Sequence, residues 1–135
     1  MIDRIIHDDE LLAIKCNASD FDAGVNFFTD EHLGLQVGVL RHEGGTKIQA
    51  HEHKKLPRQI ETTNEVLVIL DGKILANFYF QEKLVAHRIC SGGDILLLVS
   101  GGHGFEVLER ACIVEAKTGP YLKTDDKVRL KTIGA

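Results

Sequence analysis

The sequence contains no apolar run that could cross a membrane and no signal-peptide pattern. Its longest unbroken aliphatic runs are five residues, Val66–Leu70 and Ile95–Val99, whereas a membrane-spanning helix needs about 20. The first ten residues are too acidic and too interrupted for a secretory leader. We therefore expect neither membrane insertion nor secretion.

Cysteine and basic residues are also scarce. The three cysteines, Cys16, Cys90 and Cys112, form no CxxC motif, which argues against a disulfide framework and a cysteine zinc site. This usage is typical of a reduced, cytoplasmic protein. Sixteen basic against twenty acidic side chains give a net charge of −4, which argues against a nucleic-acid partner.

What the chain does contain is short apolar segments separated by turn residues. A length of 135 residues with 44% hydrophobic residues predicts a single domain, 1–135, with its own core. There are two prolines and thirteen glycines, and most glycines fall between apolar segments, as in proteins with many short strands. We predict strands over residues 35–41, 46–53, 65–70, 73–80, 84–90, 95–99, 105–108 and 111–117.

The order of these strands predicts the class of fold. Asp71-Gly72 is a typical two-residue hairpin turn between two of them. Residues 8–13 fit either a helical turn or the start of a strand. Sequential antiparallel strands in this number predict an all-β sandwich or closed barrel, centred on residues 35–117. Residues 1–34 and 118–135 are then flanking segments that pack on it.

The strands over 65–70 and 95–99 are apolar on both faces. An antiparallel strand with one solvated face alternates between apolar and polar residues. Another sheet or a second subunit must therefore cover the outer face, and we favour a homodimer.

Histidine and glutamate form the most informative pattern. His51 and His53 are two residues apart, so on a strand they project from one face and can share a metal ion. Glu65 begins an apolar strand on the same face as its core residues, where a carboxylate is costly unless paired or metal-bound. His103 lies in a glycine-rich turn directly after a predicted buried strand.

The spacing of these residues resembles the cupin superfamily. Gly45, five residues, His51-x-His53, then Glu65, six residues and Gly72 follow its first motif, and Gly92 to His103 keeps the spacing of its second. The gap between His53 and Glu65 is longer than is usual. Residues 100–106 and 117–121 are also similar to a cupin subgroup associated with polysaccharide and sugar metabolism.

This resemblance implies a double-stranded β-helix, a jelly-roll-like antiparallel barrel. It implies that His51, His53, Glu65 and His103 hold a divalent transition metal. Imidazole with carboxylate suits Fe, Mn, Ni, Cu or Zn, and the sequence does not choose among them. Four protein ligands around an octahedral metal leave two positions open for a small-molecule substrate.

Substrate contacts are predicted in the loop that follows the histidine pair. Lys54, Lys55 and Arg58 could meet a phosphate or carboxylate if the barrel opens there, although a solvated basic loop explains them as well. His87 alternates with Val85 and Ile89 and could point toward the site.

Three functions fit these residues. The first is a metal-binding cupin that acts on a small polar molecule, such as a sugar or sugar phosphate, by isomerase or oxygenase chemistry. The second is a metal-free sugar-nucleotide epimerase or ketoisomerase, in which His51 or His53 is the base and Tyr79 the acid. The third is a non-catalytic ligand-binding cupin, so the sequence does not decide whether the protein is an enzyme.

Overall fold

A computed structural model of the chain describes residues 1–121 and 127–131. It is all-β, as predicted, and all its strand pairs are antiparallel. The elements are β1 (Asp3–His7), β2 (Glu10–Asn17), the 3₁₀ turn η1 (Ala18–Asp20), β3 (Gly24–Phe27), β4 (Gly38–Arg41), β5 (Glu65–Phe80), β6 (Lys83–Ser91), β7 (Asp94–Leu98) and β8 (Gly102–Lys117). No helix among the described residues is long and apolar enough to span a bilayer.

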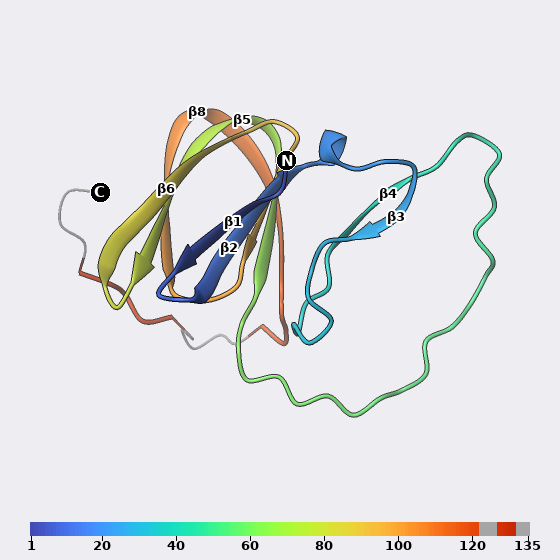
Figure 1. The fold of residues 1–135 in the computed structure, drawn as a ribbon, viewed down its shortest axis with the longest axis horizontal. Coiled ribbons are helices and arrows are strands. Elements are labelled where there is room, and N and C mark those ends of the chain that lie inside the picture. Colours follow the sequence, from blue (N-terminus) through green and yellow to red (C-terminus); the bar gives the residue numbers. More distant parts are fainter. Residues whose placement is uncertain (122–126, 132–135) are drawn as a thin grey trace.

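Two long, bent strands organise the main sheet. Its order is β1-β2-β7-β5-β6, and β8 pairs with β5 outside this order. The first part of β5 pairs with β7 and the second part with β6, while β8 follows β5 from end to end. In Figure 1 the two strands arch over together. Among the described residues the sheet does not close into a hydrogen-bonded barrel.

Several predictions of local structure are wrong. The predicted strands 105–108 and 111–117 are one strand, β8, which also contains His103, a residue predicted to lie in a turn. Asp71-Gly72 is not a hairpin turn, because β5 continues through it with irregular pairing to β8 on either side. Residues 46–53 form no strand, and all residues from 41 to 63 are exposed. The loop 42–64 extends away from the main sheet in Figure 1. The region that the sequence left open, residues 8–13, contains the turn from β1 into strand β2.

The core has two parts. Both halves of β5 contribute to the inner cluster, so the bent sheet encloses it: Ile5, Leu12, Ala13, Leu67, Ile69, Ile74, Ala76, Phe78, Cys90, Leu96 and Leu98. The outer cluster is built on Ile14, Cys16, Phe28, Ile95 and Leu97.

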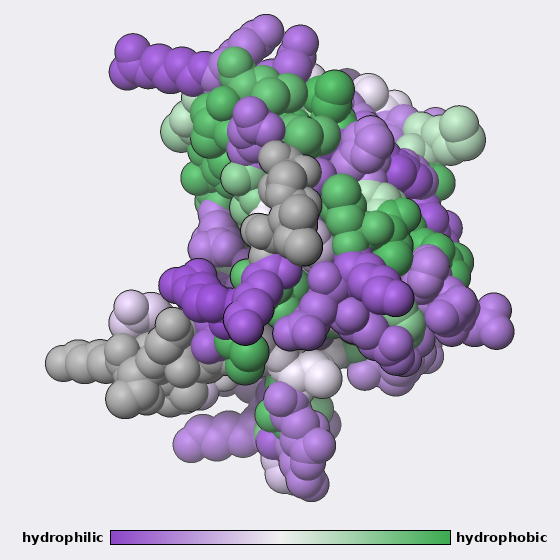
Figure 2. Space-filling model, turned by 90° about the vertical axis from the view of Figure 1, so that its left-hand side faces the viewer, coloured by the Kyte–Doolittle hydropathy of each residue, from purple (hydrophilic) through white to green (hydrophobic). Residues whose placement is uncertain are grey.

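The outer cluster explains why the β5 and β7 strands are apolar on both faces. Val66 and Val68 of β5 pack there with side chains from residues 21–39, the region that contains β3 and β4. The chain therefore covers its own sheet, and the reason for favouring a second subunit was wrong. Homodimerisation stays a prediction. Leu84, Ile89, Val107 and Leu108 on β6 and β8 are exposed, and Figure 2 shows apolar patches within a mainly hydrophilic face.

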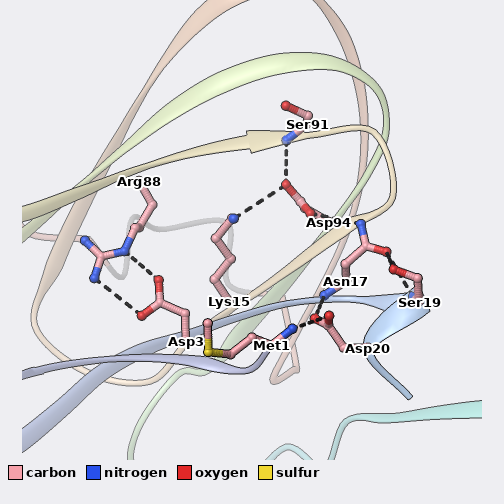
Figure 3. A network of polar contacts seen from close by, with 9 residues as sticks. All are labelled: Met1, Asp3, Lys15, Asn17, Ser19, Asp20, Arg88, Ser91 and Asp94. Atoms are coloured by element: carbon pink, nitrogen blue, oxygen red, sulfur yellow. Dashed lines mark hydrogen bonds and ion pairs between the residues drawn. The ribbon is translucent and has the colours of Figure 1, made fainter. Parts of the chain in front are cut away.

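A polar network connects the N-terminal strands to the rest of the sheet (Figure 3). Arg88 of β6 donates to both carboxylate oxygens of Asp3 on β1, at 2.6 and 3.4 Å, and these hydrogen bonds lower the pKa of Asp3. Asp94 accepts from the Ser91 amide at 2.8 Å and from Asn17 at 3.0 Å. Because β1 and β6 are the two ends of the sheet order, the Arg88–Asp3 pair bridges them through side chains.

Candidate functional site

A cavity of about 960 Å³ lies beside β5 and β8, within the range of small-molecule sites. Its described lining comes from both ends of these strands and from the segment 127–130. The lining residues are Thr63, Glu65, Asn77, Tyr79, Gly101–Glu106, Glu115, Lys117 and Lys127–Leu130. None of the residues in the polar network of Figure 3 is among them.

Glu65 and His103 meet in this cavity. Glu65 is the first residue of β5, and His103 is the second residue of β8. Glu65 Oε2 lies 3.6 Å from His103 Nε2, and the two side chains keep 13% and 32% of their surface exposed. This distance is slightly longer than a hydrogen bond, so the contact is electrostatic. Glu65 pairs with Lys117 and His103 pairs with Phe78, near opposite ends of the β5–β8 pairing. The bend in β5 and β8 brings these two ends together.

The surroundings favour the neutral forms of both groups. Burial raises the pKa of the Glu65 carboxyl, and a hydrogen bond with Glu115 and the charge of Glu115 raise this pKa further, while Lys117 and Lys127 act against the shift. Burial lowers the pKa of His103, the charge of Glu115 raises it, and Lys127 lowers it. The imidazole is therefore neutral near pH 7 and able to accept a proton.

Glu65→Gln is expected to stabilise the protein at neutral pH. Because the folded pKa lies above the ordinary value of 4.5, the carboxyl favours folding at low pH, and its contribution is lost as the pH rises through the folded pKa. Glutamine keeps a donor toward Glu115 without the charge. We expect the melting temperature at pH 7 to rise by about 2–5 °C, and the gain to vanish near pH 4.

The control for this stability measurement is Glu43→Gln, since Glu43 is exposed outside the cavity. It should leave the melting temperature unchanged at both pH values. A Glu65→Gln protein that melts lower than the wild type at pH 7 would contradict the argument, because the carboxylate would then be stabilising.

His51 and His53 lie elsewhere, on the exposed loop 42–64. Their ring centroids are 5.2 Å apart, and His51 Nδ1 lies 2.8 Å from the Gln49 carbonyl. The structure brings together two of the four predicted ligands, Glu65 and His103. In the described part of the chain no group of three or more His, Cys, Asp or Glu side chains is placed to hold a metal ion. As placed, His51 and His53 lie outside the cavity that contains Glu65 and His103.

The predicted substrate contacts also lie outside the cavity. Lys54, Lys55 and Arg58 belong to the same exposed loop, and His87 is exposed on β6 opposite Asn77. Tyr79, the predicted acid of the epimerase interpretation, does line the cavity, together with His103 instead of His51 or His53.

Sequence reasoning missed the roles of Glu115, Lys117 and Lys127. The sequence pattern could have indicated two of them. Glu115 and Lys117 alternate with Ile113, which packs against the core, so all three side chains lie on the same face of β8. Lys127 carried no comparable signal, since it follows the strands and lies in no regular element.

Comparisons of this chain with family models, with curated proteins and with solved structures found no match.

Proposed function

We propose that this protein is a cupin-type double-stranded β-helix whose cavity binds a small polar molecule and moves protons on it through His103 and Glu65. The observation that carries the proposal is the contact between these two partly desolvated groups inside a ligand-sized cavity. Titratable groups with shifted pKa values in a concave site are characteristic of catalytic acids and bases. The bent pairing of β5 with β8 supports the fold assignment.

The chemistry that suits this pair is proton abstraction next to a carbonyl. Neutral His103 accepts the proton from carbon through Nε2, and the bond electrons form the enol or enolate. Glu65, whose raised pKa helps it to hold a proton, then delivers a proton to oxygen. Protonated His103 then returns a proton to carbon, and Glu65 takes back a hydroxyl proton as the carbonyl re-forms, which completes an isomerisation or an epimerisation. A sugar or a related hydroxycarbonyl compound is therefore the expected substrate class.

Solvent hydrogen exchange tests this proposal without knowledge of the product. The full-length protein is incubated in D₂O with a panel of aldoses, ketoses, uronates and sugar phosphates, and mass spectrometry follows deuterium at carbon. We expect one class of compound to gain deuterium far faster than without protein. Saturable binding with no exchange in any compound would favour the non-catalytic alternative and reject the proton-transfer proposal.

Metal binding remains the second candidate, favoured by the resemblance and by the proximity of the His51 and His53 rings. It requires the loop 42–64 to carry these rings to Glu65 and His103. If it holds, protein supplemented with Fe, Mn, Ni, Cu or Zn should retain about one equivalent of metal, and His51→Ala and His53→Ala should each remove most of it. His42→Ala, a change at another exposed loop histidine, is the control. Retention below about a tenth of an equivalent would reject this candidate.

A further inference from the structure

We infer that the molecule bound in this cavity carries a phosphate or carboxylate group, which Lys117 and Lys127 recognise. The inference rests on the proposed function only in that it uses the same cavity. It places the anion-binding side chains on the end of β8 and on the segment 127–130, whereas the sequence suggested the loop that contains Lys54, Lys55 and Arg58.

The segment 127–130 is held against the start of β8. A Cβ atom added at Gly102 would lie 2.4 Å from Leu130 Cδ1 and 3.3 Å from Tyr79 Cβ. The missing side chain of Gly102 leaves the space that the end of the Leu130 side chain occupies. Because Gly102 is next to His103 in the chain, this contact places the segment beside the Glu65–His103 pair.

Lys127 acts on both members of that pair. Its positive charge lowers the pKa of Glu65 and also that of His103. Lys127 lines the same cavity as Glu65 and His103, so its charge acts on both groups at short range, where Coulomb interactions are strongest. An anionic group bound at Lys127 would therefore sit next to the reacting end of the molecule.

Lys117 approaches the pair from the strand side. It is the residue of β8 that pairs with Glu65, it lines the cavity, and its charge also lowers the pKa of Glu65. The side chain is half-buried, and its ammonium lies 5.5 Å from the centre of the Tyr121 ring. Two lysines from separate parts of the chain thus converge on the same end of the cavity.

The charges of the lining favour an anion. The described lining contains three carboxylates, Glu65, Glu106 and Glu115, and three permanent cations, Lys117, Lys127 and Arg129. Burial and the neighbouring Glu115 raise the pKa of Glu65, which favours the uncharged form of that carboxyl. A weaker negative charge at Glu65 offsets less of the positive charge of Lys117 and Lys127 in the described lining, and grouped charges of one sign in a concave site attract ligands of the other.

Binding of three matched sugars to the full-length protein tests this inference. Isothermal titration compares glucose 6-phosphate, glucuronate and neutral glucose at low ionic strength. We expect at least one of the two charged sugars to bind about tenfold or more tightly than glucose. The charged sugar that gains this affinity identifies the group as phosphate or carboxylate, and added salt should reduce the gain.

Four variants localise the effect. Lys117→Met and Lys127→Met should each remove most of the preference for the charged sugar and leave glucose binding unchanged, while Lys127→Arg should retain it. Lys131→Met is the matched control, since Lys131 follows the same segment but does not line the cavity. Circular dichroism confirms that each variant is folded. If Lys127→Met does not fold, Lys117→Met and Lys127→Arg still test the inference.

Three results would overturn the inference: equal affinity for glucose and both charged sugars, no measurable binding of any of the three, or a Lys131→Met variant as impaired as Lys127→Met. The proposed proton transfer fails by a different measurement, the absence of carbon-bound deuterium. A protein that binds charged sugars through Lys117 and Lys127 without exchange would therefore support this inference and reject that function.

Discussion

His103→Gln is expected to lower the rate of carbon–deuterium exchange by about 100-fold or more, the usual contribution of a positioned general base. Glutamine has a similar length and can still donate a hydrogen bond, but it cannot accept a proton from carbon. Because His103 lines the cavity and is only 32% exposed, water would not replace it easily. Binding of the substrate itself should change by only a few fold.

The control for this measurement is His42→Gln, since His42 is exposed and lies outside the cavity. It should exchange deuterium at the wild-type rate. The dependence of the exchange rate on pH separates a base from a structural role, because activity should rise as His103 loses its proton, below the ordinary imidazole pKa of 6.5. Full activity in His103→Gln would remove this residue from the mechanism.

Gly72→Ala is expected to destabilise the fold by about 2–5 kcal/mol, a large share of the stability of a small domain. Gly72 has φ +86°, and a Cβ there would lie 2.1 Å from the Arg110 carbonyl oxygen and 2.5 Å from Ala111 Cα. These atoms belong to the backbone of β8, which cannot move aside without breaking its pairing with β5. Urea denaturation followed by circular dichroism measures the loss.

Gly44→Ala is the matched control for the denaturation experiment. Nothing lies within 4 Å of the Cβ position at Gly44, and the residue belongs to the exposed loop. Its free energy of unfolding should match that of the wild type within about 0.5 kcal/mol. Equal midpoints for Gly72→Ala and the wild type would mean that β8 does not cross β5 this closely.

The Asp71-Gly72 pair illustrates how far local patterns predict this fold. The need for glycine was real, but its cause is the close crossing of β8 within a continuous strand and not a hairpin turn. A dipeptide pattern reports the backbone conformation and not the partner that requires it. Short apolar segments bounded by turn residues, by contrast, predicted most of the strands from residue 65 onward, because a buried strand requires apolar side chains.

The site was predicted in part for a similar reason. Glu65 attracted attention because a carboxylate on an apolar face needs a partner, and the structure supplies His103 and Glu115. His51 and His53 formed the clearer pattern in the sequence, yet neighbouring histidines can occur on any exposed loop. Which charged residues share a cavity depends on the bend of β5 and β8 and on the course of segment 127–130, and no local spacing encodes these.

The position of β2 in the main sheet has a consequence for the order of folding. Ala13 pairs with Leu98, and Asn17 pairs with Asp94, so β2 must wait for most of the chain before its second neighbour exists. Such long-range pairing slows folding and prolongs the time for which apolar strands are exposed. During synthesis, β1 and β2 leave the ribosome before β7, so β2 has only β1 to pair with until β7 has followed.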